Sequence, residues 1–402
     1  MNHFHIHTLS LRRCRGGMLG TAARIMLALI VGAAAVACGG DDVLTAASDE
    51  PHMPDEEGVV YLTLDVEISE NLGDAAVSRA DNDYYFQRPL LQNEKLNDLR
   101  VIIVRTDNNT IEHNRQVKYD ERGQIINNNN LTFKVVPGKK RICLVGNLNG
   151  LPEDLRRRLN QLAEGTEMTA DILDDVTLTR LPMTPSFAAD RDIPMTETFD
   201  DIDVEAIKPA DSNIPTYLYK TLFVTRVATK YTIETPEDYS SLKIRLYGIA
   251  TEQYLMPHDT EYKPQKGLPA QIISGISGRA ITKFSTPADA PVEDFEIELT
   301  GKTPVNDAEG NFLYYRYNSF YLMETAGTEF KINALIDGDL GKIDGVDYSG
   351  TWFPDNQIFP NLPSLPRNTH VIVRMSAKYG LHCVVDVVPY RGCTLEPYFG
   401  LE

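Results

Sequence analysis

The chain has 402 residues, of which 42% are hydrophobic, and its formal net charge is −18 at pH 7. A chain this acidic is repelled by nucleic-acid phosphates and by anionic membrane surfaces, so we exclude nucleic acid as a partner. The length and the hydrophobic content are sufficient for two domains with cores of their own.

The first 37 residues have the pattern of a secretory signal peptide. Four arginines precede an apolar run from Ile25 to Val36, which is too short to span a bilayer. The run ends at Ala35-Val36-Ala37-Cys38, and small residues before a cysteine resemble the bacterial lipobox. We therefore predict that Cys38 becomes the acylated N-terminal residue, with its lipid as the membrane attachment. The alternative is an ordinary signal peptide beside an unmodified cysteine.

Residues 38–57 are small and acidic and are predicted to form a tether. After it, hydrophobic residues alternate with polar ones at Val60, Leu62, Leu64, Val66 and Ile68. A period of two is typical of a strand that buries one face. We expect this strand to contribute strongly to whichever sheet it joins.

Arg79 is the first basic residue after the lipid site, since residues 39–78 contain no lysine or arginine. A trypsin-like protease acting on exposed loops would therefore cut first after Arg79, just beyond the first strand. The alternative is that Arg79 is a solvated loop residue.

Two hairpins and one helix are predicted in the middle of the first half. Residues 99–104 and the segment from 111 form one hairpin, and residues 131–136 and 141–145 form the other, across Pro137-Gly138. The helix spans residues 152–163, where Leu155, Leu159 and Leu162 make one apolar stripe with Leu151 just before them.

The second half repeats the opening plan after a linker at 209–215. A long strand over residues 222–232 is followed by short segments at 242–246, 295–299, 312–323, 330–336, 370–375 and 381–388. Short strands separated by turn residues favour antiparallel sandwiches. We predict an all-β fold with two tandem sandwich domains, 58–210 and 211–402, and a short helix.

No arrangement typical of catalysis or metal binding stands out. The histidines are scattered, and no zinc-protease motif, Cys-x-x-Cys pair or phosphate loop occurs. Asp337 to Gly341 with Asp344 and Asp347 resembles a calcium loop faintly, but hairpin turns are the preferred interpretation. We expect no enzyme activity, cofactor or metal. Cys143 should be a buried thiol, and pairing of Cys383 with Cys393 is left open.

Several segments, taken in order, resemble the fimbrillin family of Bacteroidales, the lipoprotein-derived subunits also called type V pilins. They are Cys38, Asn97–Ile103, Gly138–Asn147, Ile193–Thr196, Val224–Lys230, Tyr254–Pro257, Phe320–Glu324 and Pro366–His370. The resemblance covers most of residues 38–402. It implies two transthyretin-like, Greek-key β-sandwich domains, export as a lipoprotein to the surface of the outer membrane, and a structural and adhesive role in a fimbrium, or pilus.

The resemblance also implies assembly by donor-strand exchange. An arginine-specific protease would cut after Arg79, the first strand would leave, and a strand from another fimbrial subunit would fill its groove. The C-terminal tail is the candidate donor, because Leu395, Phe399 and Leu401 share one parity. The alternative is that the tail packs on its own domain. A host or bacterial surface receptor is a further implied partner.

The alternative function is that of a surface-anchored glycan-binding lipoprotein. Such a protein needs exposed aromatic side chains on one sheet face. The single Trp352 and tyrosines spread singly along the sequence make this function the second choice.

Overall fold

The computed structural model describes residues 60–68, 91–126, 131–179, 191–205, 216–258, 260–261, 283–287, 289–307, 309–324, 331–337, 342–343, 346–347, 349–353, 367–376 and 382–389. The signal peptide, the tether, Arg79 and the tail with Leu395, Phe399 and Leu401 lie outside these ranges, as do Cys38 and Cys393. Within the ranges, no helix is both long enough and apolar enough to cross a membrane.

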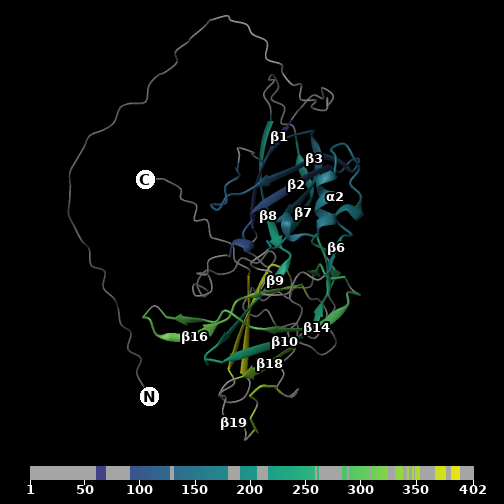
Figure 1. Cartoon of the computed structure of the whole chain (residues 1–402). Coiled ribbons are helices and arrows are strands. Elements are labelled where there is room, and N and C mark those ends of the chain that lie inside the picture. The colour runs from purple at the N-terminus through teal and green to yellow at the C-terminus, as the bar shows by residue number, and fades with distance from the viewer. Residues whose placement is uncertain are drawn as a thin grey trace, which may run out of the picture. The chain divides into compact units, whose positions relative to one another are not determined.

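Seven of the described strands form the sheet of the first half, in the order β3-β2-β5-β7-β8-β1-β4 (Figure 1). They are β1 (Val60–Ile68), β2 (Asp98–Arg105), β3 (Thr110–Lys118), β4 (Thr132–Val135), β5 (Gly138–Gly146), β7 (Met195–Val204) and β8 (Thr216–Arg226). β7 and β8 pair at only two positions, Met195 with Arg226 and Thr196 with Thr225, so the sheet divides there into two layers. Side chains of β2 and β5 from one layer and of β1, β4 and β8 from the other share one core. The predicted β-sandwich is confirmed.

The first strand forms as its alternation predicts. Val60, Leu62, Leu64 and Val66 are buried and Ile68 is half-buried, whereas the residues between them are partly or fully exposed. β1 lies between β8 and β4, in the middle of its layer. The strand therefore has a neighbour on each edge.

Of the two predicted hairpins, the first is confirmed and the second is wrong. β2 and β3 pair as neighbours, with Asn109 in the left-handed conformation at their turn. β4 and β5 both form, but β4 pairs with β1, and β5 pairs with β2 and β7. Because both edges of β5 are occupied, no edge remains for β4. The chain instead passes to the other layer at Gly138, whose φ of 125° suits glycine.

The predicted helix is confirmed as α2 (Glu153–Gln161), which begins directly after Pro152. Leu155 and Leu159 pack with the outer-face side chains of β2 and β5, including Cys143 and Val145. Both faces of these two strands are therefore buried, one in the sandwich and one under the helix. Short 3-10 helices are η1 (Gln92–Glu94), η3 (Leu148–Gly150) and η4 (Ala170–Ile172).

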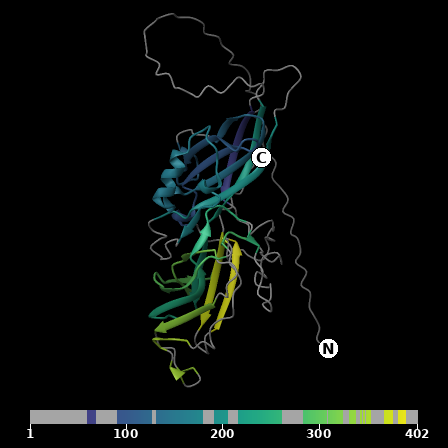
Figure 2. The ribbon, with the colours of Figure 1, turned by 90° about the vertical axis from the view of Figure 1, so that its right-hand side faces the viewer.

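The described strands of the second half form two main sheets around a second core (Figure 2). One has the order β15-β16-β9-β22-β23, from β15 (Thr303–Asn306), β16 (Phe312–Arg316), β9 (Ala228–Thr235), β22 (Thr369–Ser376) and β23 (His382–Pro389), and β17 (Phe320–Met323) also pairs with β9. The other has the order β14-β10-β18-β21, from β14 (Val292–Glu298), β10 (Ser241–Ala250), β18 (Lys331–Asp337) and β21 (Thr351–Trp352). Two-stranded pairs are β6 (Thr177–Thr179) with β11 (Glu252–Tyr254), β12 (Thr260–Glu261) with β13 (Lys283–Phe284), and β19 (Lys342–Ile343) with β20 (Val346–Asp347).

The change from the first set of sheets to the second falls at Val227. The long strand predicted over residues 222–232 is two strands, β8 and β9, and they belong to different sheets. Val227 lies between them, is buried, and donates its amide to the Pro194 carbonyl at 2.9 Å. The division into two domains remains a proposal. We place its boundary at Val227 rather than at 210, because β8 pairs with β1 and β7.

Candidate functional site

The main chain of β1 is hydrogen-bonded on both edges. It runs parallel to β8 over all nine residues, from Val60 opposite Thr216 to Ile68 opposite Val224. It runs antiparallel to β4 over its first four residues, and the Leu64 amide then donates to the Leu131 carbonyl at 2.9 Å. Removal of β1 would therefore leave two strand edges with unpaired amide and carbonyl groups.

The inward face of β1 fills part of the core of the first sandwich. Val60 and Leu62 are 0% exposed, Leu64 is 4% exposed and Val66 is 9% exposed. At about 1.5–3 kcal/mol for each buried aliphatic side chain, the four contribute roughly 6–12 kcal/mol, an upper bound because unfolded chains are partly collapsed. The loss of β1 would remove part of the cover of this core, whose other residues include Leu99, Val101, Ile103, Phe133, Ile142, Leu144, Leu222 and Val224. A second extended segment with the same alternation could cover them.

The outward face of β1 continues onto β8 and carries aromatic side chains. Tyr61 stacks on Tyr217, with ring centroids 5.3 Å apart and planes inclined by 19°. Tyr219 and Phe223 follow on the same face of β8, and both are exposed. The expectation that the tyrosines lie singly is therefore wrong for this face, because strand pairing brings Tyr61 beside residues more than 150 positions later.

A buried polar cluster lies where β8 passes into β9. The Arg226 guanidinium donates from Nε and Nη2 to the Glu94 carbonyl, at 3.1 and 2.8 Å. The Glu94 carboxylate accepts from Lys230 Nζ at 2.5 Å and from the Tyr321 hydroxyl at 2.6 Å. Burial acts to raise the pKa of Glu94, but the charge of Lys230 and the hydrogen bonds together lower it by more than burial raises it. This pKa therefore lies below its ordinary value. Glu94 is thus ionised and paired at neutral pH.

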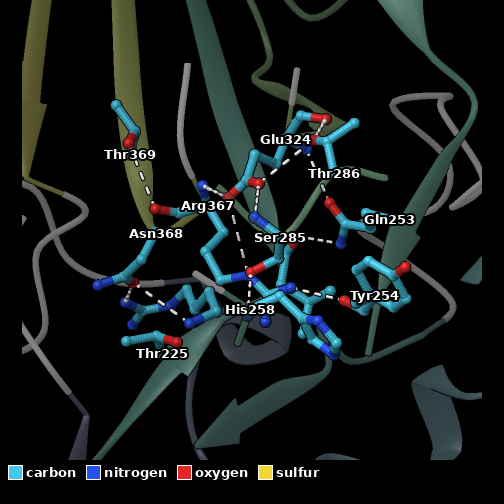
Figure 3. Close-up of polar contacts among 12 residues, drawn as sticks. Thr225, Gln253, Tyr254, His258, Ser285, Thr286, Glu324, Arg367, Asn368 and Thr369 are labelled. Carbon is cyan, nitrogen blue, oxygen red and sulfur yellow. Dashed lines mark hydrogen bonds and ion pairs between the residues drawn. The ribbon is translucent and has the colours of Figure 1, made fainter. Parts of the chain in front are cut away.

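A second buried cluster surrounds Glu324 and Arg367 (Figure 3). The Glu324 carboxylate accepts from the Arg367 amide at 2.9 Å, from the Thr286 hydroxyl at 3.2 Å and from the Ser285 amide. The Arg367 guanidinium donates to the Leu255 carbonyl at 3.0 Å and to the Tyr254 carbonyl at 2.6 Å. Burial raises the pKa of Glu324 and lowers that of Arg367, while their mutual attraction opposes both shifts.

The two clusters join segments that are far apart in the sequence. Glu94 precedes β2, whereas Lys230 and Tyr321 lie in β9 and β17 of a different sheet. Arg367 also donates to the Thr196 hydroxyl of β7 at 3.2 Å. Their role is structural, because a buried charge that loses its partner lowers the free energy of unfolding.

Sequence reasoning missed these charged residues as a group. Arg226 and Lys230 lie in a largely apolar stretch, and Glu324 directly follows the apolar strand β17. A charge beside an apolar run is a signal of burial with a partner, but its spacing does not reveal the partner.

The predicted buried thiol and the calcium-like loop can also be compared with the structure. Cys143 is a buried free thiol, as expected, and burial raises its pKa to about 11, so it is neutral and unreactive at pH 7. Asp337 ends β18 and Asp347 lies in β20, and the rest of the calcium-like loop is outside the described residues. No cluster of three or more potential metal ligands occurs among the described side chains.

No protein-family model matches the chain, and no curated protein sequence is significantly similar to it. Among solved structures, it is similar to the tip fimbrial protein Mfa3 from Porphyromonas gingivalis with C-terminal truncation, at 12% identity and a TM-score of 0.47 over 82% of this chain and 99% of that one. It is also similar to a fimbrial assembly protein from Parabacteroides distasonis, at 9% identity and a TM-score of 0.37 over 82% of this chain and 98% of that one. The fimbrial anchor protein Mfa2 from Porphyromonas gingivalis gives 9% identity and a TM-score of 0.37 over 82% and 99% of the two chains.

Proposed function

We propose that the protein is a structural and adhesive fimbrial subunit that assembles by donor-strand exchange. In this proposal the chain is exported as a lipoprotein through Cys38 and reaches the surface of the outer membrane. An arginine-specific protease then cuts after Arg79, β1 is displaced, and a strand from the next subunit takes its place. The protein acts through assembly and contact and not through catalysis.

The position of β1 is the observation that supports this proposal most. β1 is paired on both edges and is buried on its inward face, yet its neighbours in the sheet come from distant parts of the chain. Its side chains alternate, so a donated segment with an apolar side chain at every second position could replace both the main-chain and the core contacts. The predicted cleavage site, Arg79, follows the end of β1 by eleven residues.

Treatment of the purified full chain with an arginine-specific protease tests the proposal. We expect cleavage after Arg79, release of the fragment that contains β1, and fibres visible by electron microscopy. Mass spectrometry of the fragment should find acyl chains on Cys38.

The matched variants are Arg79→Ala and Arg79→Lys. Neither should be cut at position 79 by the arginine-specific enzyme, but trypsin should cut the lysine variant there and restore fibres. Fibres formed by uncut Arg79→Ala protein would contradict the requirement for cleavage. An unmodified N-terminus at another residue would contradict lipidation.

A further inference from the structure

Three exposed aromatic rings lie along one face of β8. Tyr217 is 57% exposed, Tyr219 is 74% exposed and Phe223 is 45% exposed. The three residues have the same parity. Tyr217 and Tyr219 are about 7 Å apart along the strand, and Phe223 follows Tyr219 at about 13 Å, with Thr221 between them. β1 adds Tyr61, which lies opposite Tyr217 and stacks on it.

This row is distinct from the scattered apolar residues of an ordinary surface. A single exposed apolar residue needs no explanation, whereas a contiguous apolar face indicates a contact. Polar groups border the rings on the same face, since Asp65 lies opposite Thr221 and Glu67 lies opposite Phe223. Thr63 lies opposite Tyr219 on the same face, and its hydroxyl is hydrogen-bonded to the Thr132 hydroxyl at 2.9 Å. The face therefore combines aromatic rings with hydroxyl and carboxylate groups.

We propose that this outer face of β1 and β8 binds a neutral saccharide. The face of an aromatic ring carries negative potential and attracts the C–H groups on the apolar side of a pyranose ring. Carboxylates and threonine hydroxyls can bond to sugar hydroxyls and fix their orientation. The face thus offers both kinds of contact that a sugar chain lying along β8 needs.

Charge favours a neutral sugar over other occupants. Asp65 and Glu67 are both exposed beside the rings and outnumber the one exposed lysine that the described part of this face carries, Lys134, which lies opposite Tyr61. The whole chain carries a net charge of −18, so an anionic saccharide is repelled. A second copy of the chain would bring the same carboxylates against each other. Charged residues are also depleted from the centres of protein interfaces.

The stacked pair prepares the face for its ligand. Tyr61 is held in register by β1, and its contact with Tyr217 limits the freedom of both rings before the sugar arrives. Less side-chain freedom is then lost on binding. The inference goes beyond fimbrial assembly, and it applies to the uncut chain that retains β1.

Isothermal titration calorimetry of the uncut Arg79→Ala protein tests whether the outer face of β1 and β8 binds a saccharide. The probes are chitohexaose, cellohexaose and mannohexaose as neutral sugars and hexagalacturonate as an anionic one. We expect at least one neutral probe to bind, and hexagalacturonate to bind more weakly than that probe. Tyr219→Ala and Phe223→Ala should each weaken binding about tenfold, which is the value of one aromatic contact. Phe312→Ala removes a ring from β16 that is as exposed (45%) as that of Phe223, and it should leave saccharide binding unchanged.

Absence of binding by all three neutral probes would overturn the proposal. Equal weakening by Phe312→Ala, or tighter binding of hexagalacturonate, would do so as well. A dimer in sedimentation that Tyr219→Ala dissociates would assign the face to a second copy instead. None of these outcomes involves fibres, so failure here is distinguishable from failure of strand exchange.

Discussion

At the scale of single residues, Glu94 predicts how stability depends on pH. Its pKa is lowered in the folded state, so the ionised form stabilises the fold above the ordinary value of 4.5, and this stabilisation is lost as the pH falls through the folded pKa. Glu94→Gln removes the charge and leaves Lys230 without its buried partner. We expect the free energy of unfolding to fall by roughly 3–5 kcal/mol at pH 7, with the difference from the parent narrowing below pH 4.5.

Urea unfolding at pH 7 and at pH 3.5 measures both effects. Glu121→Gln, at an exposed turn position, is the control and should match the parent at both values. A constant difference between the parent and the Glu94 variant across this range would show that ionisation of Glu94 does not stabilise the fold.

At the scale of the element, β1 is a strand with two unequal faces. Leu62 is 0% exposed in the core, so Leu62→Ala should lower the free energy of unfolding by about 2–5 kcal/mol. Asp65→Ala, on the exposed face of the same strand, should change it little. The measurement is urea unfolding of the uncut chain, and equal midpoints for the two variants would contradict the placement of β1 in the core.

At the scale of the whole molecule, the C-terminal tail predicts how subunits join. If the tail is the donor, Leu395→Asp with Phe399→Asp should leave cleavage after Arg79 intact but keep the cut protein monomeric, because a donor strand needs apolar residues at every inward position. Tyr398→Asp changes the other parity and is the control. Normal fibres from the double variant, seen by electron microscopy, would assign the donor to another segment.

The two proposals make opposite demands on β1. Strand exchange removes β1, whereas the saccharide-binding face includes Tyr61, Asp65 and Glu67 of that strand. Cleavage after Arg79 should therefore abolish saccharide binding, and binding by assembled fibres would contradict the role of β1 in that face. A subunit that keeps β1 would bind sugar without adding the next subunit.

The sequence by itself determined the elements whose signal is local. Alternation over Val60–Ile68 specified a strand with one buried face, and the leucine stripe specified α2. The turn before Thr110 specified the hairpin of β2 and β3, since only a short loop separates them. A period or a turn depends on neighbouring residues, so it can be recognised without knowing the rest of the fold.

Only the tertiary structure decided which strands pair and which charges meet. β1 pairs in parallel with β8, although more than 150 residues separate the two strands in the sequence. β4 does not pair with β5, because β2 and β7 already occupy both edges of β5. The contact of Glu94 with Arg226 spans 132 positions, and Tyr61 joins the aromatic row of β8 only because β1 lies against β8. Such partners are selected by burial of whole faces and by the strand edges that remain free, and no local pattern records either quantity.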